Sequence, residues 1–188
     1  RDPVPGVYDA SGLRPRLRGD LDLTGEGGSS VVLDGLVIEG DVVVHAGDLG
    51  SLTLSGCTVA GSVRIEDGQG GGHAGAGSDA ALQVRVLRSQ CGPIRFGREP
   101  ASLQLVDSTV DAGSPAAAAV AVSGAALALS VQGSTVLGRV LARTLEGSNA
   151  ILDGRVVIEN RQVGCLRYSF APRASRVPRR YRCSPTPT

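Results

Sequence analysis

Cysteine and histidine are the side chains of this chain that most readily hold metals or act as nucleophiles. The sequence has four Cys and two His. No two cysteines are separated by only two residues, and neither His45 nor His73 lies at ligand spacing from a Cys. Structural zinc sites usually combine closely spaced pairs of these residues. We therefore expect no metal site and no cofactor.

The four cysteines fall into two groups. Cys57 and Cys91 stand where the repeat described below requires a buried apolar residue, so we expect them to be core thiols. Cys165 and Cys183 flank an Arg-rich segment near the end of the chain. These two could form a disulfide, but their spacing in the sequence does not establish the pairing.

Carboxylates are the groups that would cleave a polysaccharide, and they are scattered along this chain. Such chemistry needs two or three carboxylates close together, in some enzymes with a basic partner. Asp34 and Asp153 occupy matching positions of the repeat, but Ser55 and Gln132 occupy that position in copies between them. Trp, on which a sugar ring could stack, is absent. We therefore expect no catalytic residues and no enzyme activity.

Arginine supplies all of the positive charge, and its distribution is uneven. From residue 160 to the end there are seven Arg and no Asp or Glu, which gives +7. Residues 1–159 hold 12 Arg and 18 acids, which gives −6. We expect the basic segment to pack on the acidic body or to dock onto a partner protein, because Arg is a common interface anchor. The candidate interaction residues are Arg173, Arg176, Arg179, Arg180, Tyr181 and Arg182.

A repeat positions these residues. Residues 31–44 align with residues 52–65 at an offset of 21 (52 − 31), with apolar residues and glycines at matching positions. Glycines coincide at Gly35 and Gly56 and again at Gly40 and Gly61. Parts of the same template recur at residues 89–96, 103–110, 129–142 and 151–157.

Each copy contains three short runs in which apolar residues alternate with other residues, and this alternation indicates strands. The pattern predicts an all-β fold, a single-stranded right-handed parallel β-helix with three short strands per coil and about five to seven coils. A β-sandwich is the alternative. It would require longer strands joined by two-residue turns. Because only 3% of the residues are aromatic, we expect Val, Leu, Ile and Ala to form the core.

The repeat also predicts how the chain is organised. We expect an N-terminal lead-in or cap over residues 1–24, the β-helix over residues 25–163, and a final strand with the Arg-rich segment over residues 164–188. Two insertions, residues 67–79 and 111–125, are expected at the third corner of a coil, where a solenoid tolerates them. The second could contain a short strand at Val120 and Val122.

The sequence contains no signal for a membrane. No run approaches the roughly 20 apolar residues of a membrane-spanning helix. The polar residues at the start are not followed by the apolar segment of a signal peptide. We therefore expect no membrane partner and no signal peptide in the given chain.

Several strings resemble the sequences of a group of bacterial proteins encoded beside contractile phage-tail-like assemblies. The strings are residues 161–170 (RQVGCLRYSF), 175–183 (SRVPRRYRC), 34–40 (DGLVIEG), 92–95 (GPIR) and 134–138 (STVLG). The resemblance spans most of residues 25–183. It implies a β-helical module of a baseplate or fibre, in a cytoplasmic assembly or an extracellular particle. By analogy with tail spikes, the module could be a homotrimer.

These observations lead to one expected function and two alternatives. We expect a non-enzymatic structural, docking or surface-recognition module whose partners are other proteins of a larger bacterial assembly, with a glycan as a further candidate partner. The first alternative is a carbohydrate-binding or polysaccharide-degrading β-helix. The second is nucleic-acid binding through the Arg-rich segment, which is disfavoured because the acidic body would repel DNA.

Overall fold

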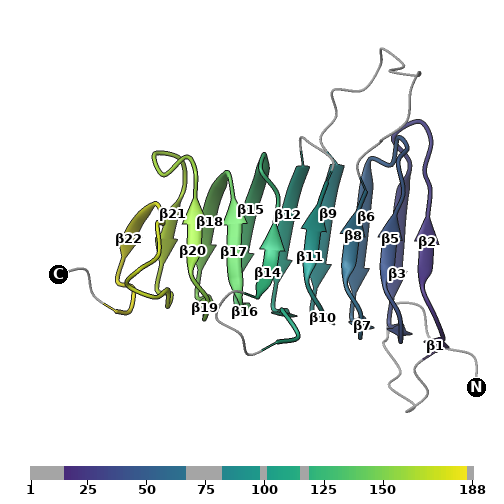
Figure 1. Ribbon diagram of the computed structural model, residues 1–188, viewed down its shortest axis with the longest axis horizontal. Helices are drawn as coiled ribbons and strands as arrows, with labels where there is room; N and C mark the ends of the chain where they lie inside the picture. Colours follow the sequence, from purple (N-terminus) through teal and green to yellow (C-terminus); the bar gives the residue numbers. More distant parts are fainter. Residues whose placement is uncertain (1–14, 67–81, 98–100, 115–118, 186–188) are drawn as a thin grey trace, which may run out of the picture.

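The computed structural model describes residues 15–66, 82–97, 101–114 and 119–185. These residues form 22 strands. No helix that could cross a membrane occurs among them. Every strand pair is parallel, and the strands form three sheets (Figure 1). Within each sheet the members follow one another at every third strand, except that β21 and β22 are consecutive.

The three sheets are named A, B and C in the order in which the chain first meets them. Sheet A contains β1 (Arg16–Leu17), β4 (Val37–Ile38), β7 (Thr58–Val59), β10 (Gln90–Cys91), β13 (Thr109–Asp111), β16 (Thr135–Leu137) and β19 (Ile151–Leu152). Sheet B contains β2 (Leu21–Leu23), β5 (Val42–Val44), β8 (Val63–Ile65), β11 (Ile94–Phe96), β14 (Val120–Ser123), β17 (Arg139–Ala142) and β20 (Val156–Ile158).

Sheet C is the longest of the three, with eight strands. It contains β3 (Ser30–Asp34), β6 (Ser51–Ser55), β9 (Leu82–Leu87), β12 (Ala101–Val106), β15 (Leu127–Gln132), β18 (Thr144–Ser148), β21 (Cys165–Arg167) and β22 (Arg179–Tyr181).

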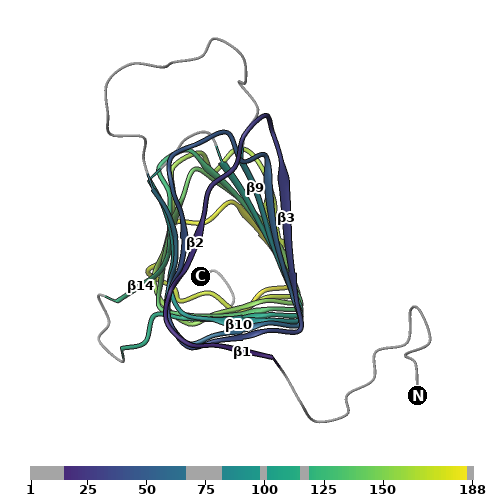
Figure 2. The same ribbon diagram turned by 90° about the vertical axis from the view of Figure 1, so that its right-hand side faces the viewer.

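This topology is a parallel β-helix, so the predicted fold class is confirmed. Viewed along the axis, the three sheets form three sides around one interior (Figure 2). The sandwich alternative is wrong for the described residues, because a sandwich built from hairpins would contain antiparallel pairs. The right-handed sense of the coil stays a prediction, based on the general preference of parallel crossovers.

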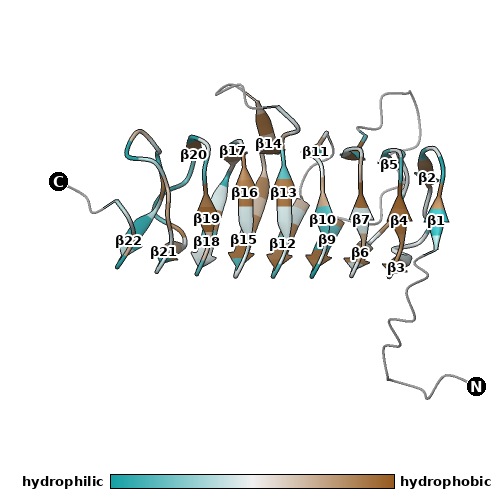
Figure 3. Ribbon diagram, turned by 90° about the horizontal axis from the view of Figure 1, so that it is seen from below, coloured by the Kyte–Doolittle hydropathy of each residue, from teal (hydrophilic) through white to brown (hydrophobic). Residues whose placement is uncertain are grey.

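The interior consists of aliphatic columns. Inward residues of sheet C, for example Leu33, Leu54 and Val86, pair in register from coil to coil, and Leu54 and Val86 are fully buried. The terminal strands β1 and β22 carry hydrophilic residues, whereas most strands between them are hydrophobic (Figure 3). Burial of continuous columns is the main stabilising contribution in such a solenoid.

The corner between sheets C and A repeats one backbone conformation in every coil. One residue per coil has a φ between 46° and 68°, the left-handed region that favours Gly, Asn and Asp. These corner residues are Gly35, Gly56, Arg88, Asp107, Gly133, Asn149, Tyr168 and Arg182. The left-handed residue turns the chain from the end of a sheet C strand toward sheet A, where Tyr168 and Arg182 lead only into the isolated bridge residues Phe170 and Ser184.

A ladder of buried serines follows this corner. Ser89, Ser108, Ser134 and Ser169 are each less than 10% exposed. The Ser108 Oγ shows the pattern, since it accepts the backbone N–H of Ser89 (3.1 Å) and donates to the carbonyl of Val106 (2.7 Å). Each hydroxyl therefore satisfies a backbone group of the neighbouring coil as well as one of its own, as buried polar groups require.

The corner between sheets A and B uses carboxylates in the first coils. The Asp20 Oδ1 accepts the N–H of Asp41 (2.8 Å), and the Asp41 Oδ1 accepts the N–H of Ser62 (2.7 Å). The hydrogen bond from the Ser62 backbone lowers the pKa of Asp41, partial burial opposes it, and Arg64 lowers it further. The Arg64 Nη1 lies 3.0 Å from the Asp41 Oδ2.

The β-helix extends beyond the expected boundaries at residues 25 and 163. Strands β1 and β2 already pair with β4 and β5 in the first coil, and β21 and β22 continue sheet C at the other end. The expected lead-in and final segment therefore supply strands of the β-helix itself.

The two expected insertions have different outcomes. Residues 67–79 lie outside the described residues; β8 before them belongs to sheet B and β9 after them to sheet C. The expected strand at Val120 and Val122 is present as β14. The second insertion was expected at the third corner, and this prediction is wrong. The insertion joins β13 of sheet A to β14 of sheet B. The register shifts at Val120 and Val122 next to it.

Candidate binding surface

The outer face of sheet C carries two rows of mostly polar side chains, because alternate residues of a strand point outward. Neighbours within a row lie about 4.8 Å apart, the spacing of paired strands. The first row is Ser30, Ser51, Gln83, Ser102, Ala128 and Thr144. The second row is Val32, Thr53, Arg85, Gln104, Ser130 and Glu146.

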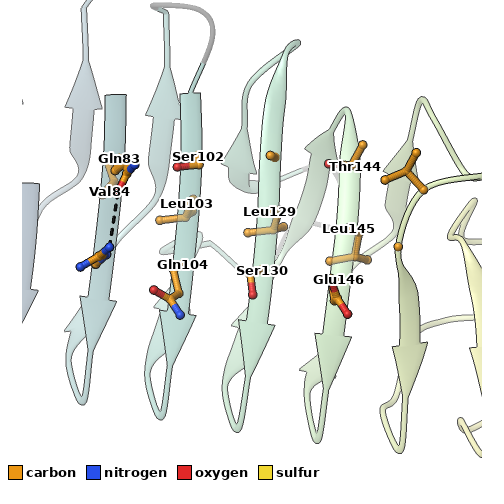
Figure 4. A pocket seen from close by; sticks show the side chains of 14 residues that line it. Gln83, Val84, Ser102, Leu103, Gln104, Leu129, Ser130, Thr144, Leu145 and Glu146 are labelled. Carbon is orange, nitrogen blue, oxygen red and sulfur yellow. Dashed lines mark hydrogen bonds between the residues drawn. The ribbon is translucent and has the colours of Figure 1, made fainter. Parts of the chain in front are cut away.

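A shallow hollow of about 430 Å³ lies over four of these strands, β9, β12, β15 and β18. We call it the sheet C groove. Its polar lining consists of hydroxyl and amide groups with one charged side chain at each end, Arg85 on β9 and Glu146 on β18. Figure 4 shows Gln104, Ser130 and Glu146 side by side on three neighbouring strands. Val163 and Gly164 border the groove near β21.

Exposed aromatic and cationic side chains gather at the C-terminal end of sheet C. The Tyr168 and Tyr181 rings meet edge to face, with centroids 5.6 Å apart at 87°. The Arg182 guanidinium lies 5.4 Å from the Tyr181 ring centroid, within cation–π range. Arg167 pairs in register with Tyr181, and Arg179 is exposed on the same strand as Tyr181. These five residues form what we call the Tyr–Arg patch.

Two residues of the patch stand at strained positions. Tyr168 and Arg182 are the last two left-handed corner residues, each with a φ of 49°. Five of the other six corners use Gly, Asn or Asp, which tolerate this conformation better. A bulky residue there costs about 1 kcal/mol of folding free energy. The corner geometry therefore does not by itself explain a Tyr and an Arg at these two positions.

Arg180, one of the predicted interaction residues, points into the β-helix instead. It pairs in register with the buried Leu166, because alternation places it on the inner side of β22. Its Nη1 donates to the carbonyls of Ala171 (3.2 Å) and Pro185 (3.4 Å). Its Nη2 donates to the carbonyl of Pro172 (3.2 Å). Arg180 thus closes the C-terminal end of the core and has a structural role here.

The other predicted residues divide between locations. Arg179, Tyr181 and Arg182 come together in the patch, as described above. Arg176 lies beside sheet B, where it lines a mainly apolar hollow with Val157, its backbone partner. Arg173 is exposed in the segment that joins β21 to β22. Tyr168 and Arg167 were not among the residues predicted from the sequence. They belong to the patch because β21 pairs with β22.

The cysteines are all free thiols in this structure. Cys57 and Cys91 are each 2% exposed and belong to the core, and burial raises the pKa of Cys91 to about 12. The disulfide that we considered between Cys165 and Cys183 is not formed. The Cys165 Sγ accepts a hydrogen bond from the Arg167 Nε (3.0 Å). The Cys183 Sγ instead donates to the carbonyl of Leu166 (3.1 Å), and Cys183 packs against the core.

One cluster of titratable groups lies elsewhere, on the N-terminal coils. The His45 Nε2 lies 2.7 Å from the Asp22 Oδ1, and its Nδ1 lies 2.8 Å from the Glu66 Oε2. Hydrogen bonds to Asp22 and then to Glu66 raise the pKa of His45. Carboxylates on both ring nitrogens favour the imidazolium, which suits a clamp between coils. In the described ranges no group of three or more His, Cys, Asp or Glu could hold a metal ion.

Comparison with protein-family models, with curated proteins and with solved structures found no match. The class of this protein, a parallel β-helix, therefore rests on its topology. The resemblance to proteins encoded beside phage-tail-like assemblies stays a prediction.

Proposed function

We propose that this chain is a non-enzymatic docking and recognition module of a larger assembly. The β-helix is the rigid support, and the Tyr–Arg patch is the main contact surface. One observation carries the proposal: two half-exposed tyrosines, Tyr168 (51% exposed) and Tyr181 (50%), lie together among exposed arginines. Only 3% of the residues in this chain are aromatic, so two exposed tyrosines in contact indicate a binding surface.

The composition of the patch favours contact with a partner. Tyr and Arg are enriched among the residues that dominate binding energy at protein interfaces. Both occupy large areas and form directional hydrogen bonds, and the ring of Tyr loses little conformational freedom on binding. No Asp or Glu occurs after residue 159, so the patch favours a partner with an acidic surface and would attract it over a distance of about 10 Å.

The larger assembly that we propose is a bacterial phage-tail-like particle, on the basis of the sequence resemblance. A continuous core without buried unsatisfied side-chain atoms among the described residues suits a load-bearing part of such a particle. The support would hold the patch at one end of a stiff rod, away from the N-terminal coils.

Co-sedimentation with purified tail-like particles tests this proposal. We expect the wild-type protein to sediment with the particles and the double variant Arg179→Ala/Tyr181→Ala to bind at least about 30-fold more weakly, since two interface anchors are removed. Arg173→Ala is the matched control, because Arg173 is exposed outside the patch. Equal co-sedimentation of the wild type and the double variant would contradict the proposal.

A further inference from the structure

We propose that the sheet C groove and the Tyr–Arg patch together bind one strand of an acidic polysaccharide that runs along the β-helix axis. An acidic sugar would lie over the patch, and uncharged sugars would occupy the groove. This inference rests on the proposed role of the patch as a contact surface, and it names the chemical class of the ligand.

The two surfaces are continuous. Strand β18, which lines the groove, pairs with β21, and β21 pairs with β22, which carries the patch. From β9 to β22 there are five steps between neighbouring strands of sheet C. At about 4.8 Å per step, the combined surface is about 24 Å long. A ligand that fills it must be extended and several sugar units long.

The groove favours uncharged, polyhydroxylated units. Hydroxyl and amide side chains such as Ser102, Gln104 and Ser130 each donate and accept hydrogen bonds. Sugar hydroxyl groups have the same double capacity, so each can find a partner in the groove. The charges of Arg85 and Glu146 lie at opposite ends, which leaves the groove without net charge from its lining.

The patch favours a carboxylate at one end of the ligand. The guanidinium groups of Arg167, Arg179 and Arg182 can bind a carboxylate with two parallel hydrogen bonds. The two half-exposed rings of Tyr168 and Tyr181 offer apolar surface beside them, on which the C–H face of a sugar can pack, although Arg182 lies over the Tyr181 ring. None of the ion pairs among the described residues involves these three arginines. Arg167 donates a hydrogen bond from its Nε to the Cys165 Sγ (3.0 Å) and interacts with the charge of Glu146, so Arg179 and Arg182 are the stronger candidates for the carboxylate.

Two other macromolecules fit less well. A nucleic acid carries a phosphate on every unit and would need cations along the groove, where Arg85 stands alone and Glu146 would repel it. A protein partner would need apolar anchors in the centre of the contact. Among the outward side chains that line the groove on its four strands only Ala128 is apolar, and Val163 is an exposed apolar residue at the border, so an acidic glycan matches both halves of the surface better than a protein does.

Isothermal titration with oligosaccharides of defined composition tests this inference. The probe is a hyaluronan octasaccharide, in which each uronate is followed by an uncharged amino sugar. Maltooctaose is the neutral comparison, and a single-stranded DNA octamer is the nucleic-acid comparison. We expect measurable binding of the hyaluronan fragment, at least tenfold weaker binding of maltooctaose and no tighter binding of the DNA.

Substitutions in each half of the surface locate the ligand. We expect Arg179→Ala to weaken binding about tenfold, since it removes a charge-assisted pair, and Gln104→Ala about fivefold, since it removes about one hydrogen bond's worth of affinity. Arg95→Ala on sheet B and Gln90→Ala on sheet A are matched controls, because both residues are exposed on other faces. Both controls should leave the dissociation constant unchanged.

Three outcomes would overturn the inference: no binding of the hyaluronan fragment, tighter binding of DNA, or an unchanged dissociation constant for Gln104→Ala or Arg179→Ala. These outcomes are separable from failure of the proposed function. If Arg179→Ala/Tyr181→Ala no longer sediments with the particles but the wild type binds no glycan, the docking function is supported and the glycan inference is wrong. If the double variant also co-sediments normally, both proposals fail.

Discussion

The two ends of this β-helix use charge in opposite ways. In the part of the chain that the structure describes, every ion pair lies on the first three coils, and all of them join neighbouring coils. At the C-terminal end none of the ion pairs among the described residues involves Arg167, Arg179 or Arg182, although Glu146 lies near enough to Arg167 to interact with its charge. Charge therefore joins neighbouring coils at the N-terminal end, whereas the C-terminal arginines form no ion pair between coils in the described residues.

The largest expected effect comes from opening the C-terminal end of the core. Arg180→Ala removes three hydrogen bonds to the carbonyls of Ala171, Pro172 and Pro185. We expect the free energy of unfolding to fall by about 2 kcal/mol, because charge-assisted bonds in a half-buried site are lost. Urea unfolding followed by circular dichroism measures this change. Arg179→Ala, on the outer side of the same strand, should change it by less than about 0.5 kcal/mol, and equal losses would contradict the inward role of Arg180.

The serine ladder is expected to be the next most sensitive feature. Ser108→Ala leaves the backbone N–H of Ser89 without its acceptor in a buried position. An unsatisfied buried donor costs about 1–2 kcal/mol, so thermal and urea unfolding should show a loss of that size. Ser130→Ala, on the exposed outer face of sheet C, is the control. If the two variants have the same free energy of unfolding, the serine ladder does not stabilise the fold.

A smaller effect is expected at the corner between sheets A and B. Asp41→Ala removes the acceptor of the Ser62 backbone N–H and the partner of Arg64, which should cost about 1 kcal/mol at neutral pH. Because the pKa of Asp41 is lowered in the folded state, its contribution is present above the unfolded pKa of about 4 and is lost as the pH falls through the folded value. Stability curves between pH 2 and 7 should therefore be flatter for the variant, and parallel curves would contradict this assignment.

The smallest effect is expected at the exposed clamp of His45. The pKa of His45 is raised by Asp22 and Glu66, so its stabilisation is fully present below the unfolded pKa of about 6.5. It should disappear as the pH rises through the folded value. His45→Gln should lose this decline, which thermal unfolding at pH 6 and pH 9 would detect. If the difference in stability between the wild type and His45→Gln is the same at pH 6 and at pH 9, the clamp contributes nothing to stability.

The repeat made most of the architecture predictable. Apolar alternation at an offset of 21 residues, as in Val31 and Leu52, located the strands of the first coils correctly. The corners at Gly35 and Gly56 were also readable, because Gly suits a left-handed residue. Coils of unequal length obscured the corner that holds the second insertion, since only backbone pairing shows that residues 111–120 join sheet A to sheet B.

The candidate site was harder to predict, because its members come from different coils. Composition identified the basic end of the chain but not the side on which each Arg lies. The register of β22 against β21 decides this, placing Arg180 inward and Tyr181 outward. The interaction of His45 with two carboxylates had no signal in the sequence, since its partners lie 23 and 21 residues away and meet it only when coils stack.

Chemical-shift mapping with the hyaluronan octasaccharide tests most directly whether charge is free at the C-terminal end and engaged at the N-terminal end. The protein has a mass of 19.1 kDa, so individual backbone amides can be followed by two-dimensional NMR. We predict shifts at Arg167, Tyr168 and β22 that continue into the sheet C groove, with none around Asp22, His45 and Glu66. Shifts centred on the N-terminal coils, or no shifts at all, would contradict the account.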